Sequence, residues 1–190
     1  NIRLAAQALD GAVVDPGGVL SFNRVVGPRT VERGYQLAPV ILHERRQVQA
    51  GGGVCQAAST LFVAALTAGL SATERWRHSS PVDYIALGQD ATIAWGAKDL
   101  KLRNDLDVPV RVRCELIGTT LAARIEAVEQ ARHTYELVSE EHALPADPGV
   151  AASRPGREIE LYRVRRDDGA ETSRELVHRD VFPPSRGSRP

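Results

Sequence analysis

The chain has 190 residues, of which 43% are hydrophobic, and its 24 basic residues balance its 24 acidic ones. This balance argues against nucleic-acid binding and against a polybasic membrane-binding segment. No stretch approaches the roughly 18 to 20 apolar residues of a membrane span. The length predicts one domain with a small appended module.

The N-terminal part of the chain predicts one helix followed by short strands. Residues 2–9 place apolar side chains on one face of a helix. Short strands are expected at 12–14 and 19–22, on either side of a Pro-Gly-Gly turn. Residues 38–43 and 46–49 fit the two strands of a hairpin.

Three glycines, Gly51, Gly52 and Gly53, lead into a cysteine that opens the strongest helical pattern in the chain. Apolar residues recur at steps of three and four over 55–67, which predicts a helix headed by Cys55. The positive end of a helix dipole stabilises a thiolate, and bare glycine backbone leaves room for a substrate or an oxyanion. Cys55 is therefore a candidate nucleophile. The alternative interpretation is a small buried residue after a tight turn.

Every element predicted between this helix and residue 127 is a strand. The expected strands are 72–77, 91–95, 100–103, 108–115 and 120–127. Residues 117–119 carry the turn that joins the last two into a hairpin. The predicted fold class is therefore α+β, an antiparallel sheet with one principal helix headed by Cys55.

A histidine and an aspartate follow the cysteine in an order that fits a thiol triad. In such a triad the imidazole of His78 would take the proton of Cys55, and a carboxylate would fix the imidazole tautomer. We favour Asp90 as that carboxylate because it follows a glycine turn and would come from a neighbouring strand. Asp83 and Asp99 are the alternatives. His78 could instead be a strand-end histidine with local hydrogen bonds.

Cys55 and Cys114 are the only cysteines in the sequence. A disulfide between them is the alternative to two free thiols. The sequence has no paired Cys-x-x-Cys or His-x-x-x-His spacing, so it predicts no metal site. We also expect no cofactor.

Composition changes near the C-terminus, where prolines and glycines gather. These residues predict a linker at 140–157 between a main domain, 1–139, and a β-hairpin extension, 158–182. An Asp-Asp-Gly turn joins the two strands of the extension. Because two strands alone are marginal in water, the extension is expected to dock on the main domain. Residues 183–190 are expected to form a flexible tail.

Several motifs in one order resemble the VanW family, which takes its name from an accessory protein of certain vancomycin-resistance clusters. They are Ser21-Phe22-Asn23, Gly27-Pro28-Arg29-Thr30, Gly34-Tyr35, Gly51 to Gln56 with Ser59-Thr60-Leu61, Glu74-Arg75 with His78-Ser79, and Gly88 to Thr92. The match runs from Asn1 to about Val112. The order of cysteine, histidine and acid is also similar to that of transglutaminase-like and papain-like thiol enzymes.

This resemblance implies a cell-envelope protein that acts on peptidoglycan or another wall polymer. Its activity would be that of a thiol-dependent hydrolase or transferase, with Cys55 as nucleophile, His78 as base and Asp90 as the orienting group. The expected substrate-binding residues are Gly51, Gly52, Gly53, Gln56, Ser59, Thr60, Asn23 and Arg29. The alternative is a non-catalytic envelope module that binds wall polymer or a partner protein.

The location expected from this resemblance is extracellular, in the cell envelope. The sequence begins at Asn1 and contains no methionine. We therefore expect it to be part of a longer protein, with a targeting or anchoring segment upstream.

Overall fold

The computed structural model describes residues 1–42, 45–128, 134–145 and 153–186. Its helices are α1 (Ile2–Leu9), α2 (Phe22–Val26) and α3 (Val54–Thr67), with a 3₁₀ turn η1 (Val31–Arg33). Its strands are β1 (Val13–Val14), β2 (Val19–Ser21), β3 (Leu37–Leu42), β4 (Arg45–Ala50), β5 (Ser71–Glu74), β6 (Lys101–Arg103), β7 (Val110–Ile117), β8 (Thr120–Ala127), β9 (Thr134–Leu144), β10 (Ser153–Arg154), β11 (Gly156–Asp167), β12 (Ala170–Phe182) and β13 (Ser185–Arg186).

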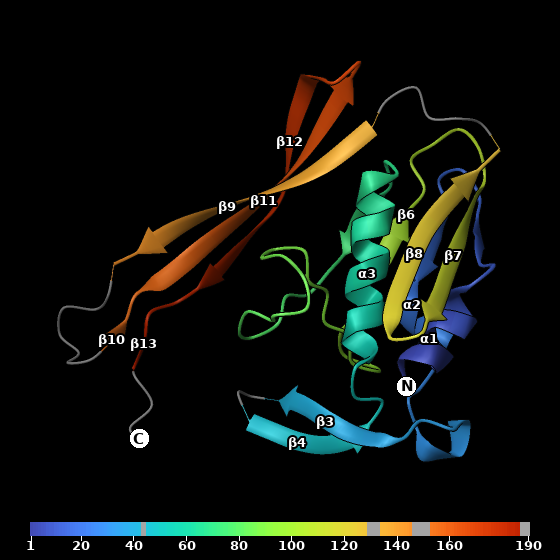
Figure 1. Cartoon of the computed structure of the whole chain (residues 1–190), viewed down its shortest axis with the longest axis vertical. Coiled ribbons are helices and arrows are strands. Elements are labelled where there is room, and N and C mark those ends of the chain that lie inside the picture. The colour runs from blue at the N-terminus through green and yellow to red at the C-terminus, as the bar shows by residue number, and fades with distance from the viewer. Residues whose placement is uncertain (43–44, 129–133, 146–152, 187–190) are drawn as a thin grey trace.

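The α+β class is confirmed, but the strands form several small sheets where one was expected. The three-stranded sheets have the orders β1-β7-β8, β2-β6-β5 and β12-β11-β9, and β3-β4 and β10-β13 are two-stranded. All of these pairs are antiparallel. Figure 1 shows α3 between β7-β8 on one side and the β9-β11-β12 sheet on the other. The loops that follow β5 therefore run between α3 and this C-terminal sheet.

The hydrophobic core forms around α3, as its apolar periodicity predicts. Its largest buried side chains include Phe22, Phe62, Leu61, Leu66, Leu100 and Leu102. Leu161 of β11 belongs to the same core, so the C-terminal sheet shares apolar contacts with the rest of the chain. Among the described residues, no helix is both long enough and apolar enough to cross a membrane.

Two of the predicted strands differ from the structure. The strand expected at 72–77 ends at Glu74, and the segment 91–95 contains only an isolated bridge from Ala94 to Lys98. The backbone N–H of Ala91 bonds the hydroxyl of Ser59, and the backbone of that segment is therefore partly committed to α3. The alternation of apolar and polar residues in segment 91–95 therefore belongs to a loop that packs between other elements, and not to a strand.

The linker expected at 140–157 overlaps two long strands. β9 continues to Leu144, and β11 begins at Gly156 and pairs with β9 along its length. Residues 146–152 of the expected linker lie outside the described residues. Pro145 directly follows β9 and Pro155 directly precedes β11, which fits strand ends because proline has no backbone N–H to donate. At the tail, β13 pairs with β10, and residues 187–190 lie outside the described residues.

The hairpin expected near the C-terminus is present as β11 and β12, both longer than predicted. Asp168 and Gly169 make its turn with positive φ angles of 51° and 82°. Arg163 donates from Nη1 to the carbonyl oxygen of Leu70 at 2.7 Å. Through this bond and its share of the core, the C-terminal sheet contacts the rest of the chain, and because β9 belongs to this sheet, residues 134–139 of the expected main domain are part of it.

Candidate functional site

Cys55 is the second residue of α3, directly after a glycine turn. Gly53 caps the helix with a φ of 90°, which favours glycine. A Cβ atom on Gly51 would lie 2.7 Å from the Cβ atom of Arg29. These glycines therefore allow a tight turn and the close approach of Arg29. In addition, the amide of Asn1 donates to the carbonyl oxygen of Gly52 at 3.0 Å and so fixes the turn from the N-terminus.

His78 and Asp90 form a short hydrogen-bonded pair. Nδ1 of His78 lies 2.6 Å from Oδ2 of Asp90, and the backbone N–H of His78 donates to the same oxygen at 2.8 Å. Because the backbone bond and the ring bond converge on one oxygen, the imidazole has a fixed orientation. Its Nε2 atom is left available for the thiol.

The Cys55 thiol interacts electrostatically with the His78 side chain, so Cys55, His78 and Asp90 lie in one cluster. Burial disfavours the imidazolium of His78, but hydrogen bonds from Asp90 and Cys55 outweigh burial and raise its pKa to about 9. The Cys55 sulfur also lies 3.8 Å from the carbonyl oxygen of Ile93. The ring of Tyr84 meets His78 edge-on, with 6.3 Å between ring centroids.

Asp90 is held from its other side by an arginine. Its burial would raise the pKa of the carboxyl, but the bond to His78 and the charge of Arg75 lower it overall. Nη2 of Arg75 donates to Oδ1 of Asp90 at 2.7 Å, and Nε donates to the Asp90 carbonyl oxygen at 2.7 Å. Nη1 contacts both carboxylate oxygens of Asp180 on β12, at 2.6 and 2.7 Å.

The two other aspartates considered for the orienting role lie elsewhere. Asp99 accepts bonds from the hydroxyl of Ser21 and the backbone N–H of Asn23, at 2.5 and 2.8 Å, and so fixes the start of α2. Asp83 is exposed. Among the described residues, Asp90 is the carboxylate bonded to His78.

Three expected substrate-binding residues of α3 have different positions. Ser59 is fully buried, accepts from the backbone N–H of Ala91 at 2.8 Å and donates to the carbonyl oxygen of Cys55. It thus supports the site without lining it. Thr60 donates to the carbonyl oxygen of Gln56 and lines a separate hollow beside β8. Gln56 is half-buried on the first turn, next to the thiol in sequence.

Arg29 and Asn23 form a polar group near the thiol. Nη1 of Arg29 donates to Oδ1 of Asn23 at 2.7 Å, and the guanidinium lies 6.0 Å from the ring centroid of Trp95. Burial lowers the pKa of Arg29, and its electrostatic interactions with Cys55, Tyr35 and Asp99 oppose this effect. Among the residues that the structure describes, no carboxylate lies within ion-pair distance of Arg29. Its half-buried charge therefore lacks a direct protein counter-ion.

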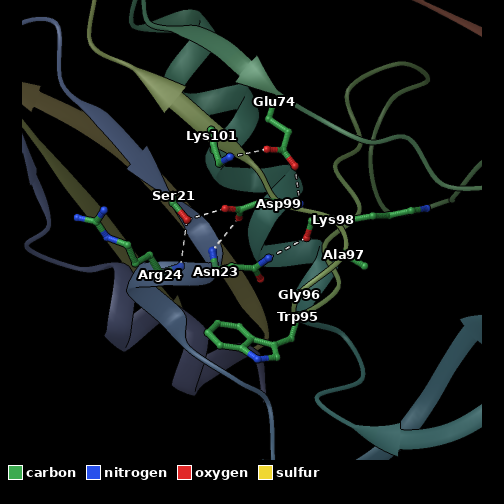
Figure 2. A pocket seen from close by; sticks show the side chains of 10 residues that line it. All are labelled: Ser21, Asn23, Arg24, Glu74, Trp95, Gly96, Ala97, Lys98, Asp99 and Lys101. Atoms are coloured by element: carbon green, nitrogen blue, oxygen red, sulfur yellow. Dashed lines mark hydrogen bonds and ion pairs between the residues drawn. The ribbon is translucent and has the colours of Figure 1, made fainter.

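An open hollow of about 460 Å³ adjoins this group. Its lining residues are Ser21, Asn23, Arg24, Glu74, Trp95, Gly96, Ala97, Lys98, Asp99 and Lys101. Figure 2 shows the ring of Trp95 at one end of the hollow and the Glu74–Lys101 ion pair, 2.7 Å long, at the other. Asn23 bonds the carbonyl oxygen of Lys98 at 2.8 Å and thereby holds the turn that carries Trp95. Trp95 is 55% exposed, so its ring is accessible to a ligand.

A separate group of potential metal ligands lies on the C-terminal sheet. It consists of Glu140, His142 and Glu160. Arg174 bonds Glu140 at 2.6 Å and Arg179 bonds Glu160 at 2.5 Å, so both carboxylates already have cationic partners. Both cysteines are free thiols, and Cys114 is buried in β7.

Sequence reasoning missed three residues that contact the site: Arg75, Tyr84 and Trp95. Arg75 stood within a quoted motif, but its bond to Asp180 joins positions far apart in sequence and no local signal indicates it.

The geometry defines an α+β domain in which a helix-start thiol meets a carboxylate-oriented imidazole. The chain belongs to the VanW family: residues 1–126 match the family model described as VanW like protein. It is 41% identical to the uncharacterized protein YoaR of Bacillus subtilis (strain 168) over 121 residues, which cover 64% of this chain and 40% of YoaR.

A second relative is the vancomycin B-type resistance protein VanW of Enterococcus faecalis (strain ATCC 700802 / V583). The identity is 29% over 144 residues, which cover 73% of this chain and 52% of that protein. The chain thus spans about half or less of the length of these two relatives. No solved structure matches the chain, and the expected similarity to transglutaminase-like and papain-like folds has no structural neighbour to support it.

Proposed function

We propose that this VanW-family domain is a thiol-dependent hydrolase or transferase of the cell envelope, acting on an amide or ester in peptidoglycan or another wall polymer. One observation carries the proposal: His78 is bonded to Asp90 through Nδ1 at 2.6 Å and interacts electrostatically with the thiol of Cys55. The name of the Enterococcus relative, a vancomycin resistance protein, supports the cell wall as the place of action.

The proposed reaction has two steps. His78 takes the thiol proton of Cys55, and the sulfur attacks the carbonyl carbon of the substrate. The bond between that carbon and the leaving nitrogen or oxygen breaks, and the leaving group takes the proton from His78. A thioester on Cys55 remains. Water or an acceptor amine then attacks the thioester, His78 takes the proton of that nucleophile, and the thiolate is released.

The surroundings of the thiol offer groups for the charges of this reaction. The backbone N–H groups of Val54 and Gln56 already donate to the carbonyl oxygens of Gly51 and Gly53, at 3.1 and 3.0 Å. We therefore assign the N–H of Cys55 itself, in the first turn of the helix, to the oxyanion of the tetrahedral intermediate. Arg29 supplies a half-buried positive charge that has no direct counter-ion within the described part of the chain. We assign it to an anionic group of the substrate, such as a carboxylate, which a guanidinium binds through two parallel hydrogen bonds.

The proposal predicts that Cys55 reacts selectively with iodoacetamide at pH 6. Burial raises the pKa of Cys114 to about 11, so this thiol stays protonated and unreactive at that pH. We expect Cys55 to be labelled on the order of ten times faster or more, measured by mass spectrometry of tryptic peptides over time. His78→Gln should slow the labelling of Cys55, because the neighbouring cation is lost.

Reactivity that is equally slow at both cysteines would contradict the proposal. So would labelling of Cys55 that does not change when His78 is replaced. His142→Gln is the matched control, because His142 lies on β9 in the C-terminal sheet and does not contact the thiol. This variant should label like the wild type.

Replacing Arg29 tests its role in substrate binding. Arg29→Gln removes the charge, and we expect the KM for peptidoglycan fragments that carry a free carboxylate to rise by about tenfold or more, with a smaller change in kcat. Arg3→Gln, at an exposed position of α1, is the control. Steady-state kinetics on fragments with a free carboxylate and on amidated fragments would show whether Arg29 binds the substrate or only packs in the fold. An unchanged KM for both kinds of fragment would assign Arg29 to packing alone.

A second candidate function is a non-catalytic envelope module that binds wall polymer or a partner protein. The open hollow with the exposed ring of Trp95 favours it, because such a ring can stack on a ligand. Trp95→Ala should then reduce the fraction of the chain that sediments with purified wall polymer. Under this function, Cys55→Ala would bind as well as the wild type, and neither would change the polymer.

A further inference from the structure

A buried ion-pair network connects the candidate site to the C-terminal sheet. Arg75 bonds the Asp90 carboxylate through Nη2 at 2.7 Å and the Asp180 carboxylate through Nη1 at 2.6 and 2.7 Å. The three side chains are only 7%, 9% and 7% exposed, in the order Arg75, Asp90, Asp180. One guanidinium therefore compensates two buried carboxylates, of which one orients His78.

Asp180 reaches this network from outside the segment that the VanW family model matches, residues 1–126. It lies on β12, where it is paired in register with Ile159 of β11. The sheet is anchored nearby, because the hydroxyl of Ser139 on β9 donates to the carbonyl oxygen of Leu87 at 2.6 Å. The carboxylate of Asp180 is thus held in place by a sheet that packs against the loop carrying Asp90.

The bonding pattern of Asp90 shows why the position of Arg75 matters. Oδ1 of Asp90 accepts from Arg75, and Oδ2 accepts both bonds from His78. A long arginine side chain keeps one rotamer only when its donors are fixed, and without Asp180 the Nη1 atom would be buried with no anionic partner. If Arg75 could change its rotamer, the Asp90 carboxylate would lose its fixed position. The His78 imidazole, which Asp90 orients, would then lose its fixed position too.

We propose that Asp180 is a positioning residue of the thiol site: through Arg75 it holds the Asp90 carboxylate in the place from which it orients His78. The C-terminal sheet then contributes to the geometry of the thiol site. This inference rests on the proposed function, because it assigns a role in orienting the base of that same site. It extends the site beyond the segment matched by the family.

The charges around the network determine in which direction a replacement of Asp180 should shift the pKa of His78. His78 faces Asp90, Cys55 and Tyr84. Asp180 faces Arg75 and, at 3.6 Å from Oδ2, the Nε2 atom of His178. Burial and the charge of Arg75 lower the pKa of His178 to about 4, so it is neutral at physiological pH.

Arg75 is therefore the cation that compensates Asp180. Removal of the Asp180 charge leaves more of the positive field of Arg75 uncompensated, and this field opposes the imidazolium at His78.

The test is a pH titration of the His78 ring in the full 190-residue chain by NMR, with His78→Gln used to assign the signal. In the wild type we expect a midpoint near 9. Asp180→Asn should lower it by roughly one unit, and the alkaline step in the rate of Cys55 alkylation should move by the same amount. Asp180→Glu keeps the charge but displaces it, and we expect a smaller shift in the same direction.

Two control variants distinguish an effect on the position of Asp90 from a general weakening of the contact between the C-terminal sheet and the rest of the chain. Glu171→Gln removes an exposed carboxylate on the same strand, paired with Arg174, and should titrate like the wild type. Arg163→Gln weakens the bond from β11 to the carbonyl oxygen of Leu70 without touching Arg75. If it shifts the His78 midpoint as much as Asp180→Asn does, docking alone accounts for the effect and the inference is overturned.

An unchanged midpoint in a folded Asp180 variant would also overturn the inference. The failure of the proposed function gives a different result, since in that case alkylation of the wild-type Cys55 would not depend on His78 at all.

Discussion

Replacing Arg75 with methionine is expected to destabilise the chain by about 3 to 5 kcal/mol, because the substitution leaves two buried carboxylates without their shared cation. Asp90 and Asp180 are both over nine-tenths buried, and both bond Arg75 within 2.7 Å. Methionine retains most of the side-chain volume, so the loss should come from charge and hydrogen bonding. Urea unfolding followed by circular dichroism would measure it as a lower midpoint with an unchanged slope.

The matched control is Arg124→Met on β8. Arg124 also bonds two acidic side chains, Glu126 at 3.0 Å and Glu115 at 3.5 Å, but it is 57% exposed. Exposed ion pairs contribute little, so we expect a cost of less than about 1 kcal/mol. Equal costs for the two variants would show that the Arg75 network is not buried as described.

Cys55→Ala is expected to remove all activity on wall material while the chain stays folded. Alanine is a good helix former and the substitution deletes only the sulfur, so the stability cost should be about 1 kcal/mol. The proposed reaction has no other nucleophile, and its rate should fall to background. The measurement is mass spectrometry of fragments released from, or joined to, purified peptidoglycan and wall polymer.

Cys114→Ala is the control for this variant, because it removes the other cysteine from a buried position on β7. It should keep its activity even if it loses some stability. A Cys55→Ala chain that unfolds would show that Cys55 has a structural role. A folded Cys55→Ala chain with full activity would exclude it as the nucleophile.

The elements that the sequence predicted well are those that local signals specify. The amphipathic pattern of α1 matches its observed bounds, Ile2–Leu9, and the turn at Gly118 joins β7 and β8 as expected. The same holds for the start of α3, which a run of glycines marks. Such signals depend on backbone conformation and periodicity within a few residues, and a single sequence contains both.

The elements predicted poorly are those that long-range contacts determine. Segment 91–95 alternates like a strand, yet Ser59 and Trp76 take its backbone N–H groups at Ala91 and Thr92. β9 was missed because its pairing with β11 depends on residues on the far side of a Pro/Gly-rich segment. Neither contact leaves a periodic signal in the sequence nearby.

In the candidate site, too, local sequence signals predicted some residues, while others depend on long-range contacts. The order of residues in the sequence pointed to Cys55 and His78 and favoured Asp90 over Asp83 and Asp99, and the structure places Cys55, His78 and Asp90 in one cluster. The roles of Arg75 and Asp180 depend on a contact between residues 105 positions apart, which no local pattern encodes. Ser59 was expected to bind substrate as a polar residue of the family motif, but it is fully buried and supports the site from beneath.

The most direct test of a nucleophilic Cys55 is to trap the thioester. The wild-type chain is incubated with purified peptidoglycan fragments, quenched in acid during turnover, and digested for mass spectrometry. We expect the peptide that contains Cys55 to carry the mass of an acyl fragment, which hydroxylamine removes and which Cys55→Ala lacks. Fragments consumed at the same rate by both proteins, with no adduct on Cys55, would contradict a thiol mechanism.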